Sequence, residues 1–186
     1  MTFPKPSRAE VQAAYGEVVP DIIAPNLQVL FCGINASIYS AAVGHHFARP
    51  GNRFWKTLHG AGFTDRLLDP SEDQQLIAYG CGLTNIVDRA TARANEVTAA
   101  EFRAGRDGLA AKVQRYSPRC LAILGISAYR IAFRQRQAQV GPQPEAFHGA
   151  LLWILPNPSG LNAHYQLRDL QRLYQELRKT LEERAE

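Results

Sequence analysis

The chain has 186 residues, a length that fits one domain with a hydrophobic core of its own. We therefore expect a single domain over residues 1–186, in which residues 1–10, with Pro4 and Pro6, are loosely ordered. Lysines and arginines number 21 against 17 acidic residues, and the resulting net charge of +4 suits a polyanionic partner without identifying one.

Cysteine usage and hydropathy exclude several classes of protein. The three cysteines are dispersed, which argues against a disulfide framework and is too few for a four-cysteine iron–sulfur cluster. The sequence has no run of 18 apolar residues and no basic amino-terminal segment leading into an apolar one. His45 and His46 have no matching acidic or histidine cluster. We therefore expect a cytoplasmic protein with no membrane partner, no metal and no cofactor.

Four short apolar runs, each bounded by Gly, Pro or polar residues, predict central strands of a parallel sheet. They span residues 27–32, 82–87, 120–124 and 151–155. Apolar residues spaced three and four apart predict helices at 54–58, 71–79, 101–116, 127–136 and 167–181. This alternation predicts an α/β fold, a three-layer α/β/α sandwich with a central, mainly parallel four-stranded sheet.

Polar loops follow the first and the last of these strands. The first reads Gly-Ile-Asn-Ala-Ser at residues 33–37, and the second reads Asn-Pro-Ser-Gly-Leu at residues 157–161. Such loops lie at the carboxyl edge of an open α/β sheet, where these folds bind ligands. A third segment, Asn-Arg-Phe-Trp-Lys at residues 52–56, lies downstream of the first loop.

Together these segments resemble the uracil-DNA glycosylase superfamily, and within it the branch of mismatch-specific uracil and thymine-DNA glycosylases. The resemblance covers most of residues 27–178. It implies a monomeric, monofunctional DNA glycosylase that flips uracil, preferably mispaired with guanine, out of double-stranded DNA. Such an enzyme hydrolyses the N-glycosidic bond and leaves an abasic site for base excision repair.

The resemblance also implies roles for single residues. It places the water-positioning amide at Asn35, which taken alone is equally a residue that ends a strand or caps a turn. It places the ring beneath the flipped base at Phe47, for which a core phenylalanine is the alternative. The other expected base-binding residues are Ile34, Ser40 and Asn157.

Departures from the family pattern bear on specificity. Asn157 stands where the most efficient uracil-specific branch has a histidine, and Ala36-Ser37 replace a Pro-Gly pair. The uracil-specific branch excludes thymine with a tyrosine in the first motif; here Tyr39 is close, but the corresponding place is Ser37 or a neighbour and has no bulky ring. We therefore expect a pocket that tolerates more than uracil and selects bases by how easily they leave the stack.

The second loop supplies the expected DNA-binding residues. Ser159, Gly160 and Asn162 belong to a segment whose backbone can approach phosphate closely. Leu161 resembles the wedge that fills the hole left by an extruded nucleotide, and its alternative is ordinary core packing.

An asparagine cannot take a proton as a carboxylate can, so a further group is expected to support the reaction. Asp88, which follows the run 82–87, is the leading candidate, with a salt bridge to Arg89 or a loop-closing hydrogen bond as the alternative. Two rival functions stay open. One is a catalytically weak lesion-binding protein of the same fold, and the other is a nucleotide-binding protein, although no Gly-x-Gly-x-x-Gly or Walker loop is present.

Overall fold

A parallel sheet forms the centre of the molecule in the computed structural model, which describes residues 3–184. Its central strands are β1 (Val29–Gly33), β2 (Cys81–Asn85), β3 (Cys120–Leu124) and β5 (Leu151–Leu155). The order in the sheet is β2-β1-β3-β5-β4, and β1 pairs in parallel with both β2 and β3. The four predicted strands are confirmed: β3 and β5 have the predicted bounds, and the ends of β1 and β2 are shifted by one or two residues.

The sheet has a fifth strand that the sequence did not predict. β4 (Gly141–Pro142) pairs antiparallel with β5 at the edge of the sheet. A proline is tolerated there because an edge strand has no second neighbour that needs its N–H. With only two residues, β4 is too short to show an apolar or alternating pattern in the sequence. The expectation of four strands was therefore wrong by this one edge strand.

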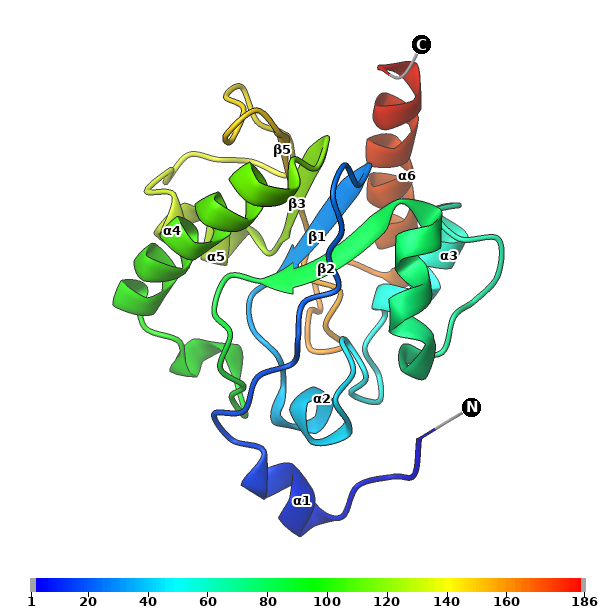
Figure 1. The fold of residues 1–186 in the computed structure, drawn as a ribbon, viewed down its shortest axis with the longest axis vertical. Coiled ribbons are helices and arrows are strands. Elements are labelled where there is room, and N and C mark those ends of the chain that lie inside the picture. The colour runs from blue at the N-terminus through cyan, green and yellow to red at the C-terminus, as the bar shows by residue number, and fades with distance from the viewer. Residues whose placement is uncertain (1–2, 185–186) are drawn as a thin grey trace.

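Helices cover both faces of the sheet. In Figure 1, α3 (Phe54–Gly60) and α6 (Leu167–Glu183) lie on one side, and α4 (Ala99–Tyr116) and α5 (Ile126–Ala132) lie on the other. Successive side chains of a strand point to opposite faces. Phe31 accordingly packs with the core residues of α3 and α6, and Leu30 packs with those of α4 and α5. The predicted α/β/α sandwich is confirmed.

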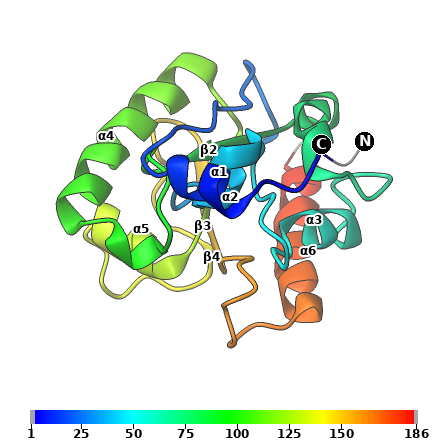
Figure 2. The same cartoon turned by 90° about the horizontal axis from the view of Figure 1, so that it is seen from below.

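Two short helices lie at the carboxyl end of the strands, α1 (Arg8–Ala13) and α2 (Ile38–Val43) (Figure 2). Within the stretch 1–10, residues 1–2 lie outside the described residues, and α1 begins at Arg8 after an N-capping Ser7. The segment Pro70–Tyr79 forms a 3-10 helix, and a further short one spans Ala94–Glu96. No helix in the described part is long and apolar enough to span a membrane.

All three cysteines are free and buried in the strands. Burial raises the pKa of Cys81 and of Cys120 to about 12, so both thiols are protonated at neutral pH. These residues therefore contribute to packing. Residues 3–184 contain no cluster that could hold a metal ion.

Two glycines of α4 provide a matched test of this packing. A Cβ at Gly105 would lie 2.0 Å from the main-chain oxygen of Ile86, whereas a Cβ at Gly108 meets nothing within 4 Å. We expect Gly108→Ala to stabilise the protein by up to about 1 kcal/mol through helix propensity. Gly105→Ala should destabilise it, because α4 must move away from the segment after β2. Urea unfolding measures both changes, and a gain in stability for Gly105→Ala would contradict the packing.

Candidate active site

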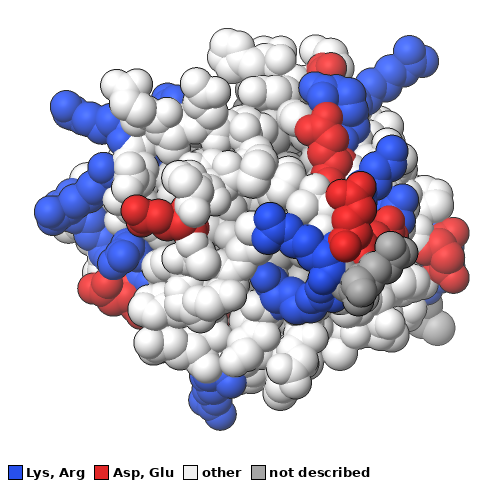
Figure 3. All heavy atoms as spheres, turned by 90° about the horizontal axis from the view of Figure 1, so that it is seen from above, with Lys and Arg blue, Asp and Glu red and all other residues white. Residues whose placement is uncertain are grey.

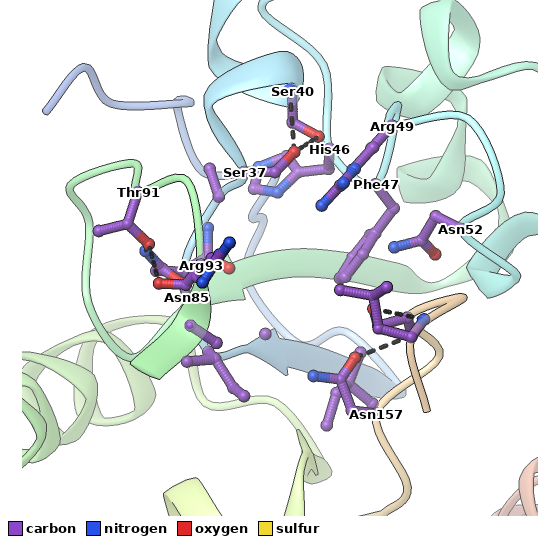
Figure 4. A pocket seen from close by; sticks show the side chains of 18 of the residues that line it. Ser37, Ser40, His46, Phe47, Arg49, Asn52, Asn85, Thr91, Arg93 and Asn157 are labelled. Atoms are coloured by element: carbon purple, nitrogen blue, oxygen red, sulfur yellow. Dashed lines mark hydrogen bonds between the residues drawn. The ribbon is translucent and has the colours of Figure 1, made fainter. Parts of the chain in front are cut away.

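A pocket of about 560 Å³ lies at the carboxyl edge of the sheet, where the segments after β1, β2 and β5 meet (Figure 4). Parallel strands bring their carboxyl ends to one edge, which explains why segments distant in sequence share this site. The polar side chains of the lining are amides, hydroxyls, a histidine and two arginines: Asn35, Ser37, Ser40, His46, Arg49, Asn52, Asn85, Thr91, Arg93, Asn95, Asn157 and Ser159.

The amide of Asn35 is held in one orientation. Its Nδ2 donates to the main-chain oxygen of Arg89 (3.0 Å) and to Oγ1 of Thr91 (2.8 Å). Thr91 uses its own hydroxyl proton on the main-chain oxygen of Arg93 (2.8 Å), so its Oγ1 can only accept from Asn35. Oδ1 of Asn35 has no partner among the described residues and is left to accept a hydrogen bond at the pocket.

The segment after β2 is fixed against the segment after β1. Main-chain nitrogens of Ile86 and Val87 donate to Gly33 and Ile34 (2.9 and 3.0 Å), continuing the pairing of β1 and β2 beyond the sheet. The Arg89 side chain is tied to α4 by a 2.5 Å ion pair with Glu101. Hydrogen bonds from Arg89 and Thr98 lower the pKa of Glu101 to about 2. The Arg89 main chain that holds the Asn35 amide is therefore itself fixed to α4.

Asp88 does not lie at the pocket. Its side chain is 61% exposed, and its nearest partner is Lys112 at 3.4 Å. The alternative salt bridge with Arg89 is also absent, because Arg89 pairs with Glu101. The neighbouring Val87 turns inward and is buried, which leaves the Asp88 side chain on the α4 side. The geometry thus supports neither a catalytic role for Asp88 nor a salt bridge with Arg89, and the hydrogen bond that Asp88 does make is with Lys112 of α4.

Phe47 combines the two interpretations given from the sequence. One part of its ring packs on Phe54, with ring centroids 4.2 Å apart and planes inclined by 21°, and the ring also lines the pocket (Figure 4). Phe47 adopts a left-handed backbone with φ 53, so the chain bends sharply to present the ring. Its position lets it serve as a stacking surface backed by the core.

Asn85, the last residue of β2, is a site residue that the sequence reasoning missed. It is 5% exposed and lines the pocket, and its amide makes no hydrogen bond to another described residue. A Cβ at Gly33 would lie 2.5 Å from its Oδ1, so glycine is what allows this close approach. The Asn85 amide is therefore free to bind a ligand in the pocket. The signal in the sequence was a polar side chain inside the apolar run 82–87.

The expected base-binding residues Ile34, Ser40 and Asn157 all line the pocket. Ser40 Oγ accepts from the main-chain nitrogen of Ala48 (3.1 Å) and from Ser37 Oγ (3.1 Å), which leaves its proton free for a ligand. No aromatic ring stands at Ser37 itself, as expected. The geometry brings these three residues together with Asn35 and Phe47.

Residues 157–165, the wedge loop from here on, border the pocket and project from the surface. Leu161 is 78% exposed and lines the pocket, which rules out core packing for it. Oδ1 of Asn157 accepts a hydrogen bond from the main-chain nitrogen of Ser159 (2.9 Å), and the main-chain oxygen of Asn157 accepts one from Nδ2 of Asn162 (3.0 Å). A Cβ at Gly160 would lie 2.5 Å from the oxygen of Gly51, so only glycine fits there.

The charge at the pocket is neutral to positive. No carboxylate lines it, and neither Arg49 nor Arg93 forms an ion pair within residues 3–184. At the opposite end of the molecule, acidic and basic side chains lie next to one another (Figure 3). The pocket is thus suited to a ligand that carries negative charge.

Comparisons with known proteins report on the family and the fold of this chain. A sequence model described as the uracil DNA glycosylase superfamily matches residues 20–181. The fold is similar to the solution NMR structure of a candidate uracil DNA glycosylase from Methanosarcina acetivorans, with a TM-score of 0.54 and 15% sequence identity. That match covers 88% of this chain and 98% of the other.

His46 gives the site a pH-dependent element. It is 3% exposed, and its Nε2 lies 2.9 Å from the main-chain oxygen of Pro20, so Nε2 carries the proton of the neutral ring. Burial lowers the pKa of His46 from its ordinary 6.5, against the opposing effects of the Pro20 oxygen and Asp73. Below pH 6.5, His46 therefore binds a proton more readily in the unfolded chain than in the folded one. The free energy of unfolding falls as the pH drops below that value.

We expect the wild type to lose more stability than His46→Gln when the pH is lowered from about 7.5 to about 5.5, because glutamine does not titrate. Urea unfolding at each pH gives the two free energies. Equal losses in the two proteins would show that His46 is not buried in its neutral form.

Proposed function

Because the chain belongs to the uracil DNA glycosylase superfamily, we propose that it is a monofunctional DNA glycosylase acting on uracil in double-stranded DNA, preferably opposite guanine. It hydrolyses the N-glycosidic bond and leaves an abasic site. In this proposal it acts as a monomer in the cytoplasm, without metal or cofactor. Tolerance for related mispaired or damaged pyrimidines follows from the absence of a ring at Ser37.

One observation carries the proposal: the oriented amide of Asn35 and the exposed Leu161 border the same pocket. An amide with a free Oδ1 can hold a water, and an exposed leucine beside a pocket can replace a base that has left the stack. A site for a free small molecule has no need of the second feature.

The reaction requires a water on one side of the sugar and a leaving base on the other. As the bond between C1′ and the base nitrogen breaks, its electron pair stays on the base and positive charge develops on the sugar. A water held by Asn35 Oδ1 then forms a bond to C1′ and releases its proton to solvent. Asn35 orients this water but cannot accept the proton, so positioning is its contribution.

Base recognition falls to neutral groups in this proposal. Uracil presents two carbonyl oxygens with an N–H between them, a pattern that the carboxamides of Asn85 and Asn157 can match. Stacking on Phe47 contributes about 1–3 kcal/mol with little discrimination among pyrimidines. Selectivity for a mispaired base then rests on the lower free energy needed to unstack it.

The alternative of a catalytically weak lesion-binding protein draws on one observation, that no carboxylate lines the pocket. Turnover separates the two functions. The protein is incubated with duplexes that differ only in the target base, and alkali then cleaves any strand that carries an abasic site. Binding to a uracil-containing duplex without strand cleavage would favour the lesion-binding alternative.

Asn35→Ala and Asn35→Asp should reduce single-turnover excision of uracil far more than DNA binding, because the activation barrier rises by on the order of 3 kcal/mol when this contact is lost. Alanine removes the water-holding oxygen, and aspartate loses the donor that Thr91 and the Arg89 carbonyl require. Asp88→Asn is the control and should stay within about twofold, since this carboxylate is exposed outside the pocket. Rates unchanged in both Asn35 variants would refute the role.

Leu161→Ala should weaken excision of uracil from a duplex and spare excision from a single strand, because only a duplex leaves a gap to fill. Unstacking costs a few kcal/mol, which the wedge offsets. The comparison uses uracil opposite guanine, uracil opposite adenine and single-stranded uracil. Equal losses on all three substrates would mean that Leu161 does not enter DNA.

A further inference from the structure

Arg53, in the segment 52–56, stands next to the wedge loop rather than at the pocket lining. All four hydrogen bonds of its guanidinium go to main-chain oxygens of that loop. Nε donates to Pro158 (3.3 Å), Nη1 donates to Tyr165 (2.6 Å), and Nη2 donates to Ser159 (2.5 Å) and Asn162 (3.1 Å). The main-chain nitrogen of Arg53 adds a fifth bond to Pro158 (3.0 Å).

This arginine has no carboxylate partner within residues 3–184. Its planar donors are instead distributed over oxygens that span eight positions of the chain, from Pro158 to Tyr165. A lysine offers three donors on a single nitrogen and cannot reach the same set at once. The chemistry at Arg53 is therefore specific to a guanidinium.

The direction of these carbonyls sets the direction of the neighbouring N–H groups. In a trans peptide the C=O and the following N–H point to opposite sides. The Ser159 and Asn162 oxygens turn toward Arg53, so the N–H groups of Gly160 and Ala163 turn away from it. Both residues are exposed, and neither N–H donates to another described residue. These donors flank Leu161 on either side.

We propose that Arg53 is a positioning residue for duplex DNA. By holding the carbonyls inward, it keeps Leu161 projected and leaves two N–H donors facing outward, where the acceptors of an unpaired base or a phosphate can meet them. The loop is then already ordered in the free protein. Its conformational entropy is lost when the protein folds, so DNA binding does not have to supply that free energy. The inference rests on the proposed function for the identity of the ligand.

The test compares Arg53→Lys with Arg178→Lys. Arg178 makes the same kind of bond, from Nε to the main-chain oxygen of Ala61 (2.9 Å), and pairs with Glu182 on its own helix. It ties α6 to the end of α3 and makes no hydrogen bond to the wedge loop. Both substitutions keep the positive charge, so a difference between them reports on the geometry of the guanidinium.

For Arg53→Lys we expect single-turnover excision of uracil opposite guanine to fall by about tenfold and excision from a single strand to change by less than about threefold. Amide hydrogen exchange across residues 159–163 should become faster in the free protein. Arg178→Lys should leave both the ratio of the two rates and the exchange of this loop as in the wild type.

Equal losses on duplex and single strand, or no loss on either, would overturn the role of Arg53, because a merely structural arginine does not distinguish the substrates. If the wild type excises uracil from neither substrate, the proposed function fails. Affinity for a mismatched duplex then decides the inference. Weaker binding by Arg53→Lys than by Arg178→Lys supports it, and equal binding overturns it.

Discussion

The parallel pairing of β1 with both of its neighbours is the constraint on which the rest of the structure depends. It places β1 inside the sheet and brings the segment after β1 between those after β2 and β5. Main-chain hydrogen bonds then continue past the last strand residues of β1 and β2 and fix the two segments together. The pocket is therefore a product of the sheet edge, with rigid walls before any ligand arrives.

Two polar side chains turn this edge into a site by binding main-chain oxygens. Asn35 donates to the segment after β2, and Arg53 donates to the wedge loop. Each leaves a defined group facing outward, a carboxamide oxygen in one case and a projected leucine in the other. Loops held in this way lose little conformational entropy on binding, which favours catalysis by positioning.

Amides are prominent among the polar side chains of the pocket, and no carboxylate lines it. Asn35, Asn85 and Asn157 stay neutral over the physiological range, and burial keeps His46 neutral as well. Because no carboxylate lines it, the site does not repel the phosphates of DNA, and its amides do not take a proton from water.

The sequence by itself determined the four central strands and the layers, because apolar runs are local signals. Asn35, Phe47 and Leu161, which line the pocket, were singled out through the resemblance to a known family. Other lining residues, among them Asn85 and Arg93, were not. The tertiary structure alone decided the remainder. Asp88 follows a strand, yet its side chain turns toward Lys112, and Asn85 turns into the pocket only because Gly33 opposite it lacks a Cβ. The bonds of Arg53 depend on partners more than 100 residues along the chain, which no local pattern encodes, and β4 is too short to leave a pattern.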